Sequence, residues 1–160
     1  VTDYIEKDET TDLYENQEKY RFKGIELGLT KRFLGTGHGR LGYAYLEAED
    51  RSDGTQVGQL EHRPRHKIAA EGGYTWSFGL SSDISIIHVA DQCFYSSKGP
   101  LQKRALNDYT LVDIKIEQAL LKGMLQAYAG VDNLLDQNYE ESYGYPQAGR
   151  KIYGGFKVRF

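Results

Sequence analysis

Side chains at the end of this chain alternate between apolar and polar with a period of two, and this pattern constrains the fold more than any other feature. Over residues 150–160 one set consists of Ile152, Gly154, Phe156, Val158 and Phe160. The other set consists of Lys151, Tyr153, Gly155, Lys157 and Arg159. Successive side chains of a strand point to opposite faces, so this segment has one apolar and one cationic face. Most soluble domains end instead in a frayed polar tail. The pattern therefore predicts a barrel with an apolar outside and a polar inside.

The same period recurs along the chain and predicts eight strands. They cover residues 1–7, 19–33, 39–50, 65–78, 81–95, 107–118, 123–133 and 150–160. The first segment is short and its alternation is unclear, which fits the far end of a strand that begins before Val1. In the fifth segment Ile87 and Val89 depart from the pattern, because they fall on the polar side.

The connections between these strands alternate in length. Short connections lie near residues 34–38, 79–81 and 119–122, and long polar ones lie near residues 8–18, 51–64, 96–106 and 134–149. Bacterial membrane barrels alternate in this way, with short periplasmic turns and long extracellular loops. If Phe160 lies at the periplasmic rim, every long connection falls on the outside. The pattern predicts an all-β, antiparallel, up-and-down transmembrane β-barrel with about eight strands present.

Composition agrees with a barrel and excludes several other classes. The chain has no run of about 18 apolar residues, which excludes a transmembrane helix but not short barrel strands. Its 13 tyrosines suit strands and membrane interfaces. The net charge of −3 implies no polyanion partner, so no nucleic acid is expected. Cys93 is the only cysteine, which excludes an internal disulfide.

Length and the first residues bear on the domain organisation. The 160 residues suffice for one domain, spanning 1–160. A secreted barrel needs a charged and apolar leader, and none precedes Val1. We therefore expect that a leader was removed or that the chain is a piece of a longer protein.

The free-energy cost of placing charge in lipid indicates which face of the sheet meets lipid and which faces the lumen. A Lys or Arg that faces the middle of a bilayer costs about 2–4 kcal/mol. The face with Lys115, Glu117, Lys157 and Arg159 is therefore expected to be the lumen. Aromatic side chains near strand ends would form the interfacial girdle, namely Tyr74, Trp76, Phe78 and Phe160. The alternative is that the same aromatic side chains fill the core of a soluble sandwich.

A motif in the last third of the chain resembles a known family. It consists of Asn133, Leu134, Leu135, Asp136, Tyr139, Gly149 and Arg150, followed by the terminal Phe160. With it, residues 128–160 are similar to the C-terminal end of TonB-dependent outer-membrane receptors. The segment 143–150 is most similar to the colicin, ferric-siderophore and vitamin B12 receptor branch. Residues 21–29, 62–76 and 105–120 resemble earlier strands of the family more loosely.

The resemblance implies a fold, a location and a set of partners. Family members take up iron chelates or cobalamin through a plugged, 22-stranded barrel, and TonB supplies the energy through a motif near the N-terminus. This chain has neither the plug nor that motif, so the resemblance implies a C-terminal barrel segment in the bacterial outer membrane. Its implied partners are membrane lipid and the barrel-assembly machinery. A metal chelate and TonB would be partners of the intact receptor only.

An eight-stranded open sheet would leave two unpaired edges in lipid. Either a parent chain supplies the missing strands, or the eight strands close into a small barrel filled by side chains.

Residue types within the motif suggest roles. Asn133 and Asp136 suit a turn, because their side chains bond to the nearby backbone and tolerate unusual dihedral angles. Arg150 is expected at the rim, in an ion pair with Asp136 or Glu141. The resemblance implies that the terminal residues are the sorting signal read by the barrel-assembly machinery, namely Phe156, Val158 and Phe160.

Ligand capture is expected in the long connections, where cations and aromatic rings suit anionic, catechol-bearing iron chelates. The candidate residues are Arg63, Arg65, Tyr95, Lys98, Tyr143 and Tyr145. Solvated loop residues are the alternative reading of the same positions.

No pattern indicates an enzyme, a cofactor or a metal centre. His62 and His66 are four residues apart, a spacing that aligns on a helix, but Pro64 between them disfavours one. The glycine-rich run 35–39 is followed by no helix and is typical of a hairpin turn. A receptor segment remains the leading hypothesis. The alternatives are a stand-alone eight-stranded outer-membrane barrel with a structural, adhesive or small-pore role, a soluble lipocalin-like barrel and, last, an outer-membrane enzyme.

Overall fold

The architecture comes from a computed structural model that describes residues 4–7, 14–17, 20–33, 36–51, 58–96 and 102–159. For residues 4–7 and 14–17 only the backbone is described. Lys98 and Phe160, two residues of the sequence-based predictions, lie outside the described residues.

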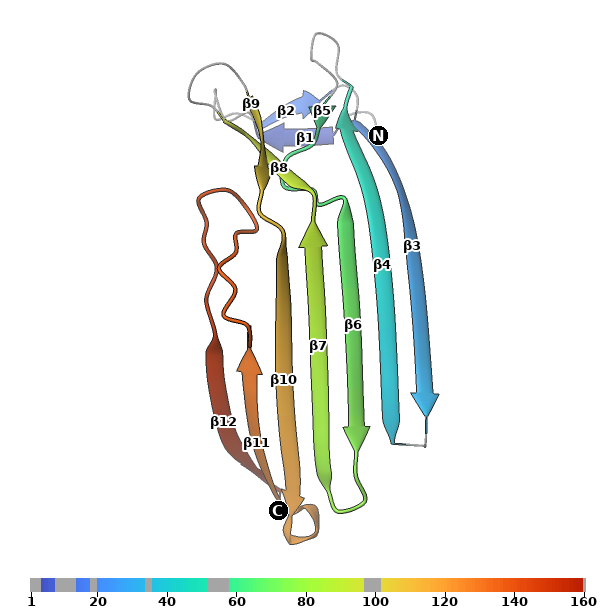
Figure 1. Ribbon diagram of the computed structural model, residues 1–160, viewed down its shortest axis with the longest axis vertical. Coiled ribbons are helices and arrows are strands. Elements are labelled where there is room, and N and C mark those ends of the chain that lie inside the picture. The colour runs from blue at the N-terminus through green and yellow to red at the C-terminus, as the bar shows by residue number, and fades with distance from the viewer. Residues whose placement is uncertain are drawn as a thin grey trace.

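Antiparallel strands that follow one another along the chain form the main sheet (Figure 1). Its order is β12-β11-β10-β7-β6-β4-β3, with the short β5 (Gly58–Gln59) paired to β4. The other strands of this sheet are β3 (Tyr20–Phe33), β4 (Gly37–Asp50), β6 (His66–Thr75), β7 (Leu80–Ala90), β10 (Tyr109–Leu120), β11 (Leu125–Asp132) and β12 (Lys151–Val158). Two hairpins lie outside it: β1 (Tyr4–Lys7) pairs with β2 (Tyr14–Gln17), and β8 (Gln92–Ser96) pairs with β9 (Gln102–Leu106).

The two ends of the sheet differ as the sequence predicts. The connections after β3, β6 and β10 are short and lie at one end, where a single 3-10 turn, η1 (Leu121–Gly123), precedes β11 (Figure 1). The connections after β4, β7 and β11 are long and lie at the other end, together with β5, β8 and β9. We call this the loop end. Strand β12 finishes at the end with the short turns.

Several strand predictions need correction. The expected strand over residues 1–7 does not join the main sheet, because β1 pairs only with β2. The expected strand over residues 81–95 is two strands, since Asp91 takes a positive φ of 55° and turns β8 away from β7. Trp76 and Phe78 lie in the turn that follows β6 and not in the strand. The short strands β2, β5 and β9 fall in segments that the sequence predicts to be connections.

Register separates an apolar face from a polar one. Cross-strand pairing places one apolar row across five strands, namely Gly72, Ile84, Ile114, Val131 and Ile152. The neighbouring row, displaced by one residue, consists of His38, Gly73, Asp83, Lys115, Gly130 and Tyr153. On the apolar face Ile116 is 48% exposed and Phe156 is 75% exposed. These side chains therefore spread over an open face and do not converge on a protein core.

In the described part of the chain, buried apolar side chains gather at the loop end. They are Tyr20, Ala48, Val89, Cys93, Phe94, Leu106 and Tyr109. Val89 opposes Tyr109 on the polar side of the sheet, which explains why Val89 breaks the period of β7. The connection after β11 contacts the sheet on this polar side, where Tyr139 packs on Tyr109. The apolar Val89 therefore lies on the polar face at the level where a long connection covers it.

Aromatic side chains gather at the opposite end, beside the short turn after β6. Tyr74 and Trp76 meet edge to face at 4.9 Å between ring centroids, and Phe78 lies 6.3 Å from Trp76. An aromatic cluster at this level is what an interfacial girdle requires, because amphipathic rings favour the boundary between lipid and water.

Candidate functional site

Ion pairs cover the polar face of the sheet. Arg40 Nη1 lies 3.1 Å from Glu71 Oε2 across β4 and β6, and Lys115 pairs with Glu117 along β10. His38 and Asp83 approach to 3.9 Å beside a cavity of about 190 Å³. Exposed pairs of this kind contribute about 0–1 kcal/mol each, so they indicate a wet surface and add little stability.

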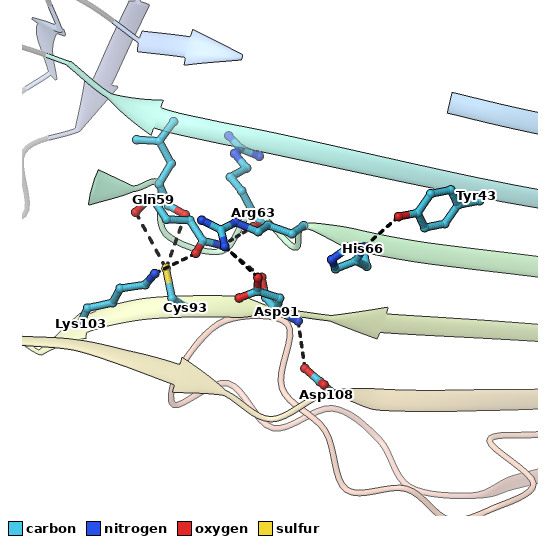
Figure 2. A network of polar contacts seen from close by, with 10 residues as sticks. Tyr43, Gln59, Arg63, His66, Asp91, Cys93, Lys103 and Asp108 are labelled. Atoms are coloured by element: carbon cyan, nitrogen blue, oxygen red, sulfur yellow. Dashed lines mark hydrogen bonds and ion pairs between the residues drawn. The ribbon is translucent and has the colours of Figure 1, made fainter. Parts of the chain in front are cut away.

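A polar network ties the connection after β4 to the β8–β9 hairpin (Figure 2). The buried Gln59 donates from Nε2 to the carbonyl of Asp91 at 3.0 Å, and Lys103 Nζ donates to Gln59 Oε1 at 2.9 Å. The Tyr95 hydroxyl donates to the Gln59 carbonyl at 2.9 Å, and the amide of Tyr95 donates to the Glu61 carboxylate. Buried amides must find partners, so this network holds the two connections in one arrangement.

Burial changes the titration of two groups in this network. The Cys93 side chain is only 1% exposed, and burial raises the pKa of its thiol. Burial also raises the pKa of the Tyr95 hydroxyl. Both groups are therefore neutral at physiological pH, and the Cys93 thiol has little of the thiolate character that reactive cysteines need.

The turn after β11 is built by the first residues of the sequence motif. Asn133 is 5% exposed and has a φ of 50°, and its backbone amide donates to Asp113 Oδ1 at 2.8 Å. Asp136 Oδ1 accepts from the backbone amide of Arg150 at 2.8 Å, which joins the two ends of the connection. Arg150 makes no ion pair with Asp136 or Glu141 among the described residues. Its Nε donates to the carbonyl of Leu134 at 3.0 Å.

The long connection after β11 folds back on itself as a small hairpin over residues 139–147, which we call the strap. Gln147 donates from its amide to the Tyr139 carbonyl at 3.0 Å, and Glu140 is bridged to Pro146. Gly144 takes a φ of 81° at the tip, where its amide donates to Glu140 Oε2 at 3.0 Å. Glycine suits this tip because the left-handed region is strained for other residues.

Ring contacts hold the strap against the loop end. Tyr143 stacks on Phe94 with 3.9 Å between centroids and 6° between ring planes. Tyr139 lies 4.6 Å from Tyr109, whose place in the alternation puts it on the polar face with Asp113 and Lys115. Gln92 Nε2 donates to the Glu141 carbonyl at 2.6 Å. The strap therefore reaches across β10 to the β8–β9 hairpin on the polar side of the sheet.

A cavity of about 550 Å³ lies between the strap and the β8–β9 hairpin. Phe94, Tyr139 and Tyr143 supply aromatic walls, and Asn107, Asn138 and Gln147 supply amides. Arg104 lines the cavity as its cation and has no ion-pair partner among the described residues, while the Glu140 carboxylate is occupied by the Gly144 amide. The volume is in the range of small-molecule sites, which combine apolar walls with a few polar groups.

The five predicted ligand residues that the structure describes do not form one cluster. Tyr143 lines the cavity, but Tyr145 is 71% exposed outside it. Arg65 pairs with Asp91 at 3.1 Å, and Tyr95 belongs to the polar network, so both hold the connections together. The carbonyl of Arg63 accepts from Gln59 Nε2 at 3.4 Å, and its side chain does not line the cavity.

The described part of the chain contains neither a group of metal-ligating side chains nor a membrane-spanning helix. No group of three or more His, Cys, Asp or Glu side chains is placed to hold a metal ion there. Among the same residues, no helix is long and apolar enough to cross a membrane.

Comparison with known proteins agrees with this geometry. Residues 1–134 match the family model described as TonB dependent receptor-like, beta-barrel. The chain belongs to the TonB-dependent receptor family. No curated protein sequence is similar enough to count as a relative.

Solved structures of TonB-dependent receptors share the fold. The ferric-catecholate import receptor Fiu of Escherichia coli superposes with a TM-score of 0.76 at 19% identity, over 99% of this chain and 24% of that receptor. The pyoverdine outer membrane receptor FpvA of Pseudomonas aeruginosa gives 0.78 at 16% identity, over 99% and 25%. The FrpB iron transporter of Neisseria meningitidis gives 0.73 at 16% identity, over 97% and 27%.

Family membership settles the location and the general class. TonB-dependent receptors are transporters of the Gram-negative outer membrane and not enzymes, and this chain carries part of such a receptor-like barrel. The chain spans about a quarter of the length of the solved receptors that it matches. The family model ends at residue 134, whereas the closest resemblance seen in the sequence alone lies in residues 128–160. The last strand is matched in the structural superpositions, which cover nearly the whole chain.

Sequence reasoning missed Phe94 and Arg104, because nothing in residues 92–106 predicts the β8–β9 hairpin that aims them into the cavity. A signal was present for Tyr139, which the motif singled out but assigned no contact. Only the fold reveals that its ring packs on Tyr109.

Proposed function

We propose that this chain forms consecutive wall strands and extracellular loops of a TonB-dependent receptor that takes up a ferric chelate of the siderophore type. Edge strands β3 and β12 each have one neighbour among the described residues, so the sheet leaves two unpaired edges. In lipid these edges need partners, because each backbone N–H or C=O group without a hydrogen bond there costs on the order of several kcal/mol. The missing neighbours are the other strands of a larger, 22-stranded barrel.

One observation carries the assignment of the ligand side. Every long connection between strands of the main sheet lies at the same end, and there the strap and the β8–β9 hairpin enclose the cavity with Arg104. A guanidinium without a counter-ion among the described residues attracts an anionic group, and aromatic walls suit planar rings. An anionic, aromatic iron chelate has both features. Two solved receptors of the same fold, a ferric-catecholate importer and a pyoverdine receptor, support an iron chelate over cobalamin, the other ligand that the sequence resemblance suggested.

The proposed receptor has further partners that follow from its class. The apolar face meets outer-membrane lipid, and the barrel-assembly machinery inserts the chain through the terminal signal Phe156, Val158 and Phe160. Phe156 and Val158 stand exposed on the apolar face. TonB would act through a plug and an N-terminal motif that are not part of these residues.

Uptake by whole cells tests the proposal. The complete coding sequence is expressed in cells that lack other siderophore receptors, and accumulation of a radio-iron tris-catecholate is measured with and without TonB. We expect TonB-dependent accumulation that unlabelled chelate suppresses and that cobalamin does not. Suppression by cobalamin instead of the chelate would refute the ligand class.

A pair of arginine variants tests the cavity. Arg104→Ala should weaken binding of the tris-catecholate about tenfold or more, since a hydrogen bond to a charged group is worth about 1.5–3 kcal/mol. Arg63→Ala is the matched control, because Arg63 is an exposed arginine of the same end that does not line the cavity. Equal loss in both variants would show that the cavity is not the capture site.

A closed barrel of this chain alone, stable in detergent micelles, would instead favour the stand-alone eight-stranded alternative.

A further inference from the structure

Strand β9 has one neighbouring strand among the described residues, which is β8. The contacts of β8 with the preceding connection show how the backbone groups of the hairpin are directed. The carbonyl of Cys93 accepts from the His62 amide at 3.0 Å, and the amide of Tyr95 donates to the Glu61 carboxylate. Backbone groups alternate in direction along a strand, so Cys93 and Tyr95 direct theirs away from β9.

The same alternation assigns the backbone of β9. Phe94 lies between Cys93 and Tyr95, so its backbone groups face β9 and bond Arg104, the residue opposite. Ala105 lies opposite Cys93, and its N–H and C=O therefore point away from β8. Neither of these two groups has a hydrogen-bond partner among the described residues. The outer edge of β9 thus offers a free donor and a free acceptor to a chain that lies beside it.

This edge borders the cavity between the strap and the β8–β9 hairpin, because Ala105 is one of the residues that line it. The Ala105 side chain lies on the face of the hairpin that carries Cys93. Phe94 and Arg104 lie on the opposite face, where Tyr143 of the strap stacks on Phe94. Ala105 therefore meets the cavity through its backbone, directly beside the guanidinium-bearing Arg104.

We propose that the outer edge of β9 binds the backbone of the ligand by strand addition, and that the receptor thereby selects chelates whose anionic rings are carried on a peptide-type linker. In this mode of recognition main-chain hydrogen bonds supply affinity, and neighbouring side chains supply specificity. The Ala105 N–H donates to a linker carbonyl, its carbonyl accepts from a linker N–H, and Arg104 binds the adjacent anionic group. This inference rests on the proposed function for the chelate, but not for the free edge.

Hydrogen exchange of the intact receptor without ligand tests whether the edge is free. The Ala105 amide should exchange about tenfold faster than the Arg104 amide, because only the latter is bonded to β8. Equal protection of the two amides would overturn the inference, whatever the ligand. A saturating ferric tris-catecholate on a peptide linker should then slow exchange at Ala105 about fivefold.

A proline variant tests the recognition itself. Ala105→Pro removes the outward N–H but keeps the bonds to β8, since proline is tolerated in an edge strand where its nitrogen faces away from the neighbour. Two synthetic ferric tris-catecholates serve as probes, one with a peptide linker and one with an alkyl linker of equal length. We expect the wild type to bind the peptide-linked chelate about tenfold more tightly, and this preference to fall about fivefold in Ala105→Pro.

Ala105→Val is the conservative variant, because valine is close in size to proline and retains the N–H. It should keep the preference for the peptide linker. Recognition of the backbone is refuted if the two variants lose the preference equally, or if Ala105→Pro weakens both chelates to the same extent. If Ala105→Pro disturbs the hairpin, seen as lost protection at Arg104, the wild type decides: equal affinity for the two chelates refutes the inference.

Failure of the proposed function can be told apart from failure of this inference. If neither chelate binds the wild type, the proposed function fails, and the iron-free peptide linker becomes the probe. Slower exchange of the Ala105 amide in the presence of this peptide supports strand addition at the edge. Unchanged exchange overturns it.

Discussion

The side-chain amide of Asn133 makes two hydrogen bonds to the backbone of Gln137: Oδ1 accepts from the Gln137 amide at 2.9 Å, and Nδ2 donates to the Gln137 carbonyl at 3.0 Å. Nδ2 also lies 3.4 Å from the carbonyl of Ala148, across the connection. A single buried side chain thus replaces backbone pairing in the turn between the end of β11 and the strap.

Asn133→Asp should destabilise this turn although it preserves size and tolerates the positive φ. The carboxylate would place an acceptor against two carbonyls, leaving buried acceptors unpaired at a cost of about 1–3 kcal/mol. Urea unfolding of the receptor in detergent, followed by loss of its heat-modifiable band, measures the change. Leu135→Ala is a suitable control because Leu135 is exposed in the same turn. If Asn133→Asp is as stable as the control, the amide does not organise the connection.

Ile116→Arg should cripple membrane folding, because it places a cation on the lipid-facing side at a cost of about 2–4 kcal/mol. Lys115→Ile, one residue away on the polar face, loses an exposed ion pair with Glu117, worth about 0–1 kcal/mol, and a cation–π contact with Tyr128 at 5.8 Å, worth about 0.5–1 kcal/mol at an exposed site. The folded fraction after refolding into lipid vesicles compares the two. Equal tolerance at both positions would contradict the assignment of the faces.

Gly24→Ala should weaken the pairing of β3 with β4. A Cβ atom at Gly24 would lie 2.6 Å from the backbone carbonyl oxygen of Tyr45, so a strand must shift. Gly28→Ala is the matched control in the same strand, since a Cβ there meets nothing within 4 Å. Hydrogen exchange of the β3 amides should rise in the first variant only. A similar rise in both would mean that loss of glycine, and not the close approach, is responsible.

Deletion of Phe160 should reduce insertion in cells more than refolding into detergent. The terminal residue is expected to act as a sorting signal for the barrel-assembly machinery, which is present only in cells. Surface-accessible receptor counted on cells, set against the heat-modifiable fraction in detergent, separates the two effects. A similar loss in both settings would leave Phe160 a packing role and no sorting role.

Cys93 should resist alkylation while the receptor is folded. Burial raises the pKa of its thiol, so the reactive thiolate is scarce and the sulfur is out of reach. A maleimide at pH 8 should modify Cys93 only after addition of urea, whereas Tyr145→Cys should react at once. The pKa of the Cys93 thiol is higher in the folded state than in the unfolded state. The contribution of this thiol to the free energy of unfolding is therefore complete below the ordinary thiol pKa of about 8.5, and it is lost as the pH rises further. Rapid labelling of folded Cys93 would show that the loop end is open.

Local periodicity made most of the wall predictable. The alternation in residues 109–120 and 151–158 already assigns Ile114, Ile116 and Val158 to one face and Lys115 and Lys157 to the other. Strand pairing preserves these faces, since neighbouring strands keep the side-chain period of two in register. The alternation of short and long connections likewise follows from local composition.

The loop end was not predictable in the same way. Residues 81–95 read as one strand, yet Asp91 bends the chain where its amide meets the Asp108 carboxylate, a partner from another part of the sequence. Arg65 and Tyr95 have the chemistry of ligand residues, but their partners, Asp91 and Gln59, come from distant segments. No local pattern records such contacts.

By itself the sequence determined the class of fold, the two faces of its sheet and the family, because each depends on neighbours in the chain or on short motifs. Only the tertiary structure decided which polar residues hold the connections together and which line the cavity. It also decided that Tyr143 lies on Phe94, 49 residues earlier in the chain. Such contacts arise from the packing of distant segments, whose free energy no local period contains.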